Sequence, residues 1–142
     1  MPRESTEHSL CNMLRTFMAR VLVIEDELQV RRIVRQMLVH DGHEVVEAGD
    51  GAQGIACVRA CRPHLVITDI VMPEKEGLET ISQLRRDEPD LPILVMSGDI
   101  EAALYLRMAE LMGAYAALAK PFNIVQLRGA VDRLLPSSRP AA

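Results

Sequence analysis

A short apolar run that ends abruptly on a carboxylate constrains this chain more than any other feature. Leu65–Asp69 is rich in apolar and β-branched residues, and Pro73 and Gly77 then turn the chain before a helix. Such a run predicts a strand buried on both faces, as parallel sheets require. A carboxylate at its carboxyl end would face the crevice where open α/β sheets bind ligands. Taken alone, Asp69 is better explained as capping or closing a turn, and only the other polar residues expected near it favour a functional role.

The rest of the chain repeats this unit, with each apolar strand followed by a helical pattern. Strands are expected at Val21–Ile24, His43–Ala48, Leu65–Asp69, Pro92–Met96 and Ala116–Ala119. Helices are expected after them: one with Val30, Ile33, Val34, Met37 and Leu38 on its apolar face, then 52–61, one marked by Leu78, Ile81 and Leu84, then 100–112, and one capped by Asn123. Strict alternation demands parallel strands and right-handed crossovers. We therefore predict an α/β, flavodoxin-like (βα)5 three-layer sandwich whose five-stranded parallel sheet has the order 2-1-3-4-5.

Length and composition narrow the class of protein further. The chain has 142 residues, which suits one domain, and its formal net charge of −4 gives no reason to expect nucleic-acid binding. No apolar run is long enough to span a membrane. Three cysteines outside any spaced framework favour a reducing compartment, and the cytoplasm is the expected location.

The two ends of the sequence differ from its middle. Residues 1–19 are polar and aperiodic at first and are interpreted as a flexible N-terminal extension, with Met13 or Met18 as other candidate starts. Residues 20–135 form the predicted domain, and residues 136–142 are interpreted as a disordered tail.

The polar residues gather where the predicted strands end. Glu25 and Asp26 follow the first strand, Asp69 the third, Ser97 the fourth and Lys120 the fifth. Parallel strands bring these ends to one edge of the sheet, where crowded carboxylates need a cation and oxygen ligands suit Mg²⁺. A phosphoryl group on Asp69 would have its charge offset by that metal, by the ammonium and by the hydroxyl.

The motifs in this order resemble the receiver domain of two-component response regulators. The matching pieces are Val23–Glu27, Asp69–Pro73 with Gly77, Met96–Gly98, Gly113–Ala114 and Lys120–Phe122, and they cover about residues 20–135. Each piece alone is a weak signal, but the set is specific.

The resemblance implies a role for each site residue. Asp69 would accept a phosphoryl group from a sensor histidine kinase or a histidine phosphotransfer protein of a phosphorelay. Mg²⁺ would be bound by Glu25, Asp26, Asp69 and the backbone carbonyl of Val71. Ser97 and Lys120 would contact the phosphoryl group, and the Lys120–Pro121 bond would be cis.

Two departures from the family pattern bear on output. The family often has an aromatic residue three positions before the lysine, where this chain has Ala117; Tyr115 lies two residues earlier. Only a short tail follows the last helix, so we expect a stand-alone receiver, similar to a chemotaxis regulator, that acts on an unknown protein target. A homodimer through the face of helix 100–112, strand 116–119 and the last helix is a further expected contact, and neither nucleic acid nor membrane is an expected partner.

Two other functions fit the sequence less well. An aspartyl-phosphate-forming phosphatase would need a second Asp two residues after the nucleophile, and neither Asp69 nor Asp26 has one. A binding-only pseudo-receiver is at odds with the complete set of acidic residues, Ser97 and Lys120. We therefore expect that the chain is not an enzyme acting on a separate substrate, and that it catalyses only its own phosphotransfer and dephosphorylation.

The remaining polar residues receive simpler interpretations. Arg31, Arg32 and Arg35 are interpreted as a solvated helix face that also suits kinase docking. His40 and His43 are expected at the surface or at a helix cap. Cys57 and Cys61 are interpreted as buried thiols rather than metal ligands.

Overall fold

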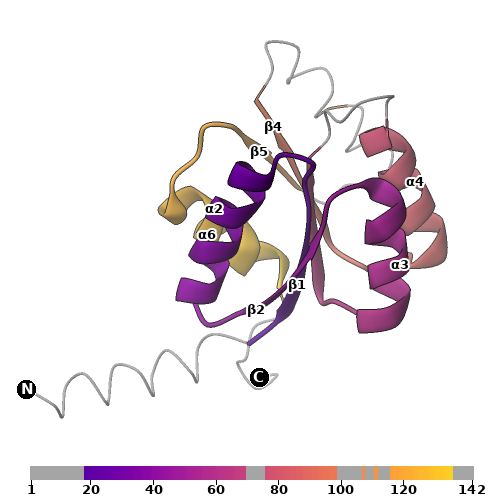
Figure 1. The fold of residues 1–142 in the computed structure, drawn as a ribbon, viewed down its shortest axis with the longest axis horizontal. Helices are drawn as coiled ribbons and strands as arrows, with labels where there is room; N and C mark the ends of the chain where they lie inside the picture. The colour runs from indigo at the N-terminus through magenta and orange to yellow at the C-terminus, as the bar shows by residue number, and fades with distance from the viewer. Residues whose placement is uncertain (1–17, 70–75, 99–106, 108–110, 112–115, 136–142) are drawn as a thin grey trace, which may run out of the picture.

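A computed structural model describes residues 18–69, 76–98, 107, 111 and 116–135, and that part contains five strands and four helices (Figure 1). The elements are β1 Arg20–Ile24, α2 Leu28–His40, β2 Glu44–Ala48, α3 Gly51–Cys61, β3 Leu65–Asp69, α4 Glu76–Asp87, β4 Ile93–Ser97, β5 Ala116–Ala119 and α6 Ile124–Leu134. All strand pairs are parallel and the order is β2-β1-β3-β4-β5, so the predicted flavodoxin-like sheet is confirmed.

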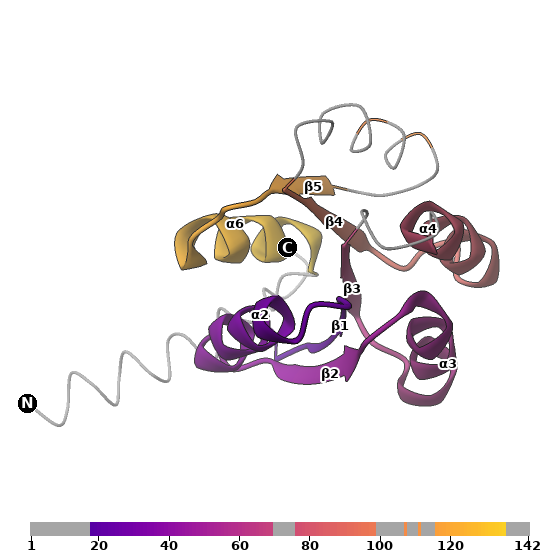
Figure 2. The same ribbon diagram turned by 45° about the horizontal axis from the view of Figure 1, so that its top comes forward.

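Helices cover both faces of the sheet, which makes the three predicted layers. Figure 2 shows α2 and α6 on one face and α3 and α4 on the other. Alternate residues of each strand therefore enter different cores: Val21 and Val23 pack with Val34 and Leu127, while Leu22 and Ile24 pack on the α3 and α4 side. Burial on both faces explains why the central strands are continuous apolar runs.

The helix ends follow from local sequence. The Asp50 side chain accepts a hydrogen bond from Gln53 N at the start of α3. Asn123 and Gln126 form a reciprocal capping box at the start of α6, as the sequence predicted for Asn123. Gly42 ends the turn after α2 with φ of 90°, a conformation that favours glycine.

Three predictions about single side chains are wrong. Ile33, assigned to the apolar face of α2, is 51% exposed, because the buried stripe centres on Val34 and Leu38 and Ile33 lies at its edge. His43 is buried rather than at the surface, and its Nδ1 accepts a hydrogen bond from Ala19 N at 3.2 Å. Cys57 and Cys61 are free but only partly buried, because α3 packs through its small residues.

Some predictions fall outside the described residues. Helix 100–112 is described only at Arg107 and Leu111, and the extension and the tail are not described apart from Met18 and Ala19. Among the described residues, no helix has the length and apolar character to cross a membrane.

Candidate functional site

Three carboxylates meet where the two central strands of the sheet end. Ile24 of β1 lies in register with Thr68 of β3, so the next residue on each strand, Glu25 and Asp69, face the same edge. Glu25, Asp26 and Asp69 each offer a carboxylate oxygen, and these oxygens lie within 4.8 Å of one another. Glu25 and Asp69 are buried and Asp26 is exposed, so the cluster opens to solvent through Asp26.

Lys120 reaches this acidic cluster from the edge strand β5. Its Nζ lies 2.9 Å from Glu25 Oε1 and 3.2 Å from Asp69 Oδ2. The cis Lys120–Pro121 bond that the resemblance implied is present. One ammonium therefore joins the ends of β1 and β3 to the end of β5, although β4 lies between β3 and β5.

Ser97 and Gly98 shape the approach of the lysine. Ser97 is the last residue of β4, and its carbonyl accepts a hydrogen bond from Lys120 N at 2.8 Å. A Cβ on Gly98 would lie 3.0 Å from Lys120 Cβ. The bare Cα of Gly98 therefore lets the lysine stem pass over the end of β4.

Burial and crowding perturb the ionisation of the cluster. Burial, then a hydrogen bond with Asp69 and the charge of that carboxylate, raise the pKa of Glu25 to about 8, against the opposing effect of Lys120. Burial lowers the pKa of Lys120, but its contacts with Glu25 and Asp69 outweigh this and leave the pKa above its usual value. The ammonium of Lys120 therefore does not keep the pKa of Glu25 in its ordinary range.

Two buried polar atoms at this edge fit a cation and a phosphoryl group. Among the described residues, Glu25 Oε2 and Ser97 Oγ are buried without a hydrogen-bond partner. Such atoms are costly unless something satisfies them. An acceptor beside two other carboxylates suits a divalent cation, and a hydroxyl donor at the end of β4 suits a phosphoryl oxygen.

The structure brings together most of the residues that the sequence singled out. Glu25, Asp26, Asp69 and Lys120 form one contact group, and Ser97 lies at the same edge of the sheet. Val71 and Tyr115 lie outside the described residues. Ala117, at the position where the family often has an aromatic ring, is a partly buried residue of β5.

Sequence reasoning missed one residue beside the cluster. Arg31, interpreted as part of a solvated face, has a side chain only 18% exposed, and its Nη1 donates to the Glu25 carbonyl oxygen at 2.9 Å. The signal was present: Arg31, Val34 and Leu38 follow the i, i+3, i+7 spacing of one helix face.

Comparison with known proteins identifies the family to which this chain belongs. The family model described as the response regulator receiver domain matches residues 21–132. The chain therefore belongs to the response regulator receiver family. Receiver domains of two-component systems are in general phosphorylated on an Asp, bind Mg²⁺ at an acidic pocket, and interact with histidine kinases and phosphotransfer proteins.

Similar proteins differ in how much of their length this chain matches. It is 36% identical over 124 residues to the DNA-binding transcriptional regulator NtrC of Azospirillum brasilense, covering 87% of this chain but 26% of that protein. The structure of NtrX from Brucella abortus matches with a TM-score of 0.80 and 30% identity, over 84% of this chain and 27% of NtrX. The chemotaxis response regulator CheY4 of Vibrio cholerae matches with a TM-score of 0.76 and 30% identity, over 84% of this chain and 100% of CheY4.

Proposed function

We propose that this chain is a phosphorylation-controlled signalling receiver in which Asp69 accepts the phosphoryl group. The observation that carries the proposal is the contact of one ammonium, on Lys120, with both Glu25 and Asp69. Lys120 also donates its backbone N–H to the Ser97 carbonyl, so it joins the acidic cluster to the end of β4. A phosphoryl group on Asp69 would therefore lie among the cation site, the Lys120 ammonium and the unsatisfied Ser97 hydroxyl.

The chemistry assigned to Asp69 is transfer from a phosphohistidine. A carboxylate oxygen of Asp69 attacks phosphorus, a P–O bond forms as the P–N bond breaks, and the imidazole nitrogen leaves with the bonding electron pair. Lys120 offsets the charge on the phosphoryl oxygens, and the Ser97 hydroxyl donates to one of them. Mg²⁺, held by Glu25, Asp26, Asp69 and the Val71 carbonyl, would supply further charge neutralisation when bound.

The partners and location belong to the same proposal. A histidine kinase or a phosphotransfer protein supplies the phosphoryl group, and the output is contact with another protein, or with a second copy through the face that includes β5 and α6. Nucleic acid is not proposed as a direct partner of this domain, because the formal net charge of −4 does not favour it. The chain catalyses only its own phosphotransfer and dephosphorylation, and it works in the cytoplasm.

Intact-mass measurement after incubation with a small phosphodonor and Mg²⁺ tests the assignment. We expect one phosphoryl adduct on the wild type and none on Asp69→Asn or when Mg²⁺ is chelated. Asp90→Asn, an exposed carboxylate in the turn after α4, is the matched control and should keep the adduct. An adduct retained by Asp69→Asn would contradict the role of Asp69, and a wild type that takes up no phosphoryl group would favour a binding-only pseudo-receiver.

A further inference from the structure

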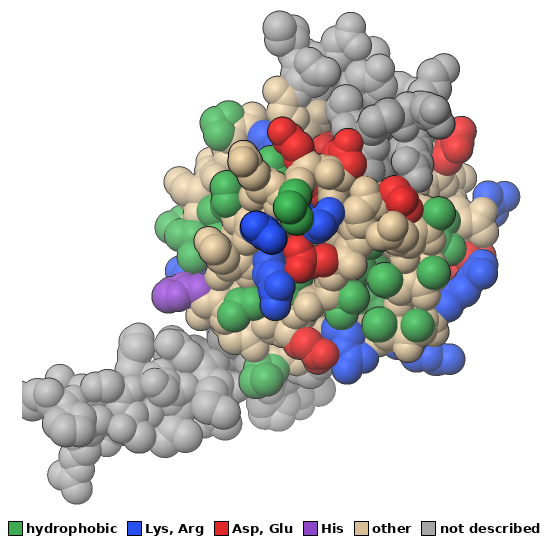
Figure 3. All heavy atoms as spheres, in the orientation of Figure 1, with side chains coloured by type: hydrophobic (Ala, Val, Ile, Leu, Met, Phe, Trp, Pro, Cys, Tyr) green, Lys and Arg blue, Asp and Glu red, His purple; other side chains and the backbone are tan. Residues whose placement is uncertain are grey.

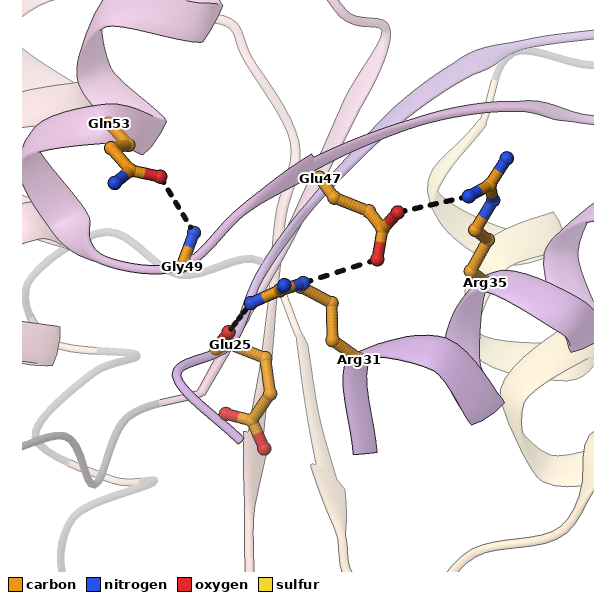
Figure 4. A network of polar contacts seen from close by, with 6 residues as sticks. All are labelled: Glu25, Arg31, Arg35, Glu47, Gly49 and Gln53. Atoms are coloured by element: carbon orange, nitrogen blue, oxygen red, sulfur yellow. Dashed lines mark hydrogen bonds and ion pairs between the residues drawn. The ribbon is translucent and has the colours of Figure 1, made fainter. Parts of the chain in front are cut away.

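Arg31 connects the edge strand β2 to the backbone of the acidic cluster. From α2, its Nη1 donates to the Glu25 carbonyl oxygen at 2.9 Å and its Nε donates to Glu47 Oε1 at 3.1 Å (Figure 4). The two bonds use two sides of one planar guanidinium. The geometry therefore fixes the direction of the Arg31 side chain as well as its position.

Glu47 is itself held from a second side. Arg35 Nη1 donates to its other oxygen, Oε2, at 3.1 Å, so one carboxylate of β2 aligns two arginines of α2. Figure 3 shows basic side chains beside an acidic one on the face that carries α2 and β2. Glu47 and Arg31 are both partly buried, with side chains 26% and 18% exposed, whereas Arg35 is 53% exposed.

The backbone of Glu25 is consequently held on both sides. Its N–H donates to the Ala48 carbonyl of β2 at 3.0 Å, and its C=O accepts from Arg31. The turn at Gly49 lies directly beside the guanidinium, since a Cβ there would be in van der Waals contact with Arg31 Nη1 at 3.4 Å. Gly49 N in turn donates to Gln53 Oε1 at 3.1 Å, which ties the turn to α3 (Figure 4).

We propose that Arg31 is a positioning residue for the cation site, acting through the peptide group between Glu25 and Asp26. That peptide joins the two acidic residues of β1's end, so fixing its carbonyl fixes the direction in which both side chains leave the backbone. The inference rests on the proposed function, because it assumes that these carboxylates bind Mg²⁺. In other metal-binding proteins, mutation of a residue that orients a metal ligand commonly weakens metal affinity by about tenfold or more.

Charge and position make opposite predictions for Arg31, which makes the proposal testable. Removing a positive charge near a cation site should strengthen Mg²⁺ binding if Arg31 acts only through its charge. If Arg31 instead positions the ligands, its removal should weaken Mg²⁺ binding. Arg31→Met keeps the length of the side chain and removes the charge, and Arg31→Lys keeps the charge but loses the fork that reaches two acceptors.

The experiment is calorimetric titration of Mg²⁺ into wild type and variants, with circular dichroism to check the fold. We expect Arg31→Met and Arg31→Lys to weaken Mg²⁺ binding by about tenfold. Arg32→Met removes the same charge from the same helix at an exposed residue outside the network of Figure 4, so it is the matched control and should change affinity by less than about twofold. Glu47→Gln should weaken binding in the wild type but add nothing to Arg31→Met, since Glu47 acts through Arg31.

Phosphorylation kinetics give a second readout. With a small phosphodonor, Arg31→Lys should raise the Mg²⁺ concentration for half-maximal rate and leave the rate at saturating Mg²⁺ close to that of the wild type. If both Arg31 variants bind Mg²⁺ as tightly as the wild type, or more tightly, the positioning role is overturned while the proposed function stands. If the wild type itself binds no Mg²⁺ and takes up no phosphoryl group, both proposals fail.

Discussion

At the scale of single residues, the site combines a buried carboxylate with an exposed one. Glu25 is fully buried and contacts Lys120, while Asp26, the next residue, is open to solvent. Substitution of the buried Glu25 would also disturb the packing and hydrogen bonds around it. The charge of the cluster is therefore better altered at the exposed Asp26. Substitution of Asp26 therefore separates metal binding from folding.

Asp26→Asn should weaken Mg²⁺ binding without destabilising the protein in the absence of metal. It removes one of three carboxylates within 4.8 Å, so the free energy of unfolding without Mg²⁺ should stay the same or rise, by at most about 1 kcal/mol. Mg²⁺ affinity should fall by at least about tenfold. Urea unfolding with and without Mg²⁺ measures both quantities, and an unchanged affinity would contradict the proposed ligand set.

His43 makes stability depend on pH at the opposite end of the sheet from the site. Burial lowers its pKa below 6.5, against the nearby carboxylates of Asp41 and Asp132, and its Nδ1 must be unprotonated to accept from Ala19 N. The unfolded chain therefore binds more protons here than the folded one, so this contribution to stability is complete above pH 6.5 and is lost as the pH falls toward the folded pKa.

Urea unfolding between pH 7.5 and 5 checks this dependence. Relative to the wild type, His43→Asn should lose less stability as the pH falls, because its amide oxygen can accept from Ala19 N without titrating. Titrating groups remote from His43 are common to both proteins and cancel in the difference. Asp132 does not, because the charge of His43 opposes the rise in its pKa, so the comparison is repeated with Asp132→Asn in both proteins. Parallel stability curves for the two proteins would refute the role of His43.

At the scale of elements, two helical glycines of different surroundings test how the helices pack. A Cβ on Gly54 of α3 would lie 2.3 Å from Cδ1 of the fully buried Ile24, so α3 approaches β1 through a bare Cα. A Cβ on Gly129 of α6 would meet nothing within 4 Å. The same substitution should therefore have opposite effects at the two positions.

Gly54→Ala should destabilise the fold by about 1–3 kcal/mol through overpacking. Gly129→Ala should stabilise it by up to about 1 kcal/mol, because alanine loses less backbone entropy in a helix. Thermal or urea unfolding of both variants measures the two changes. Equal effects at the two sites would show that helix propensity, and not the contact of α3 with β1, decides the outcome.

At the scale of the whole molecule, the question is how the site could affect a distant surface. By resemblance to receiver domains, we expect a phosphoryl group to draw the Ser/Thr hydroxyl inward and an aromatic ring on the fifth strand, where there is one, to follow. Ala117 has no ring to move, whereas Ser97 Oγ is buried without a partner among the described residues. We therefore expect the signal to pass through Ser97 and the segment that follows β4.

Backbone amide NMR with beryllofluoride and Mg²⁺, which mimic the phosphoryl group, checks this route. The largest shift changes should fall at residues 97–106, with smaller ones around Ala117. Ser97→Ala should reduce the changes beyond residue 98 while those near Asp69 remain. Changes confined to the neighbours of Asp69 in the wild type would mean that no signal leaves the site by this route.

The sequence by itself determined the order and type of the elements and the gathering of the polar residues. Runs such as Leu65–Asp69 are apolar throughout because both faces of a central parallel strand are covered, and this pattern is local. Strict alternation of strands and helices then requires the polar strand ends to share one edge. The sequence pattern therefore predicts that Asp69, Glu25 and Lys120 lie at one site.

Which side chains of a helix face the sheet, and which groups they contact there, depends on how the elements pack. Ile33 is exposed and Arg31 is largely buried, although hydrophobicity alone would predict that Ile33 is the more buried of the two. The buried stripe of α2 is set by its contacts with the strands and with α6, and Arg31 enters that interface because Glu47 and the Glu25 carbonyl satisfy its charge and donors. These partners lie on other elements, 6 and 16 residues from Arg31 along the chain, so the energy of the contacts depends on a geometry that the helical pattern of α2 does not contain.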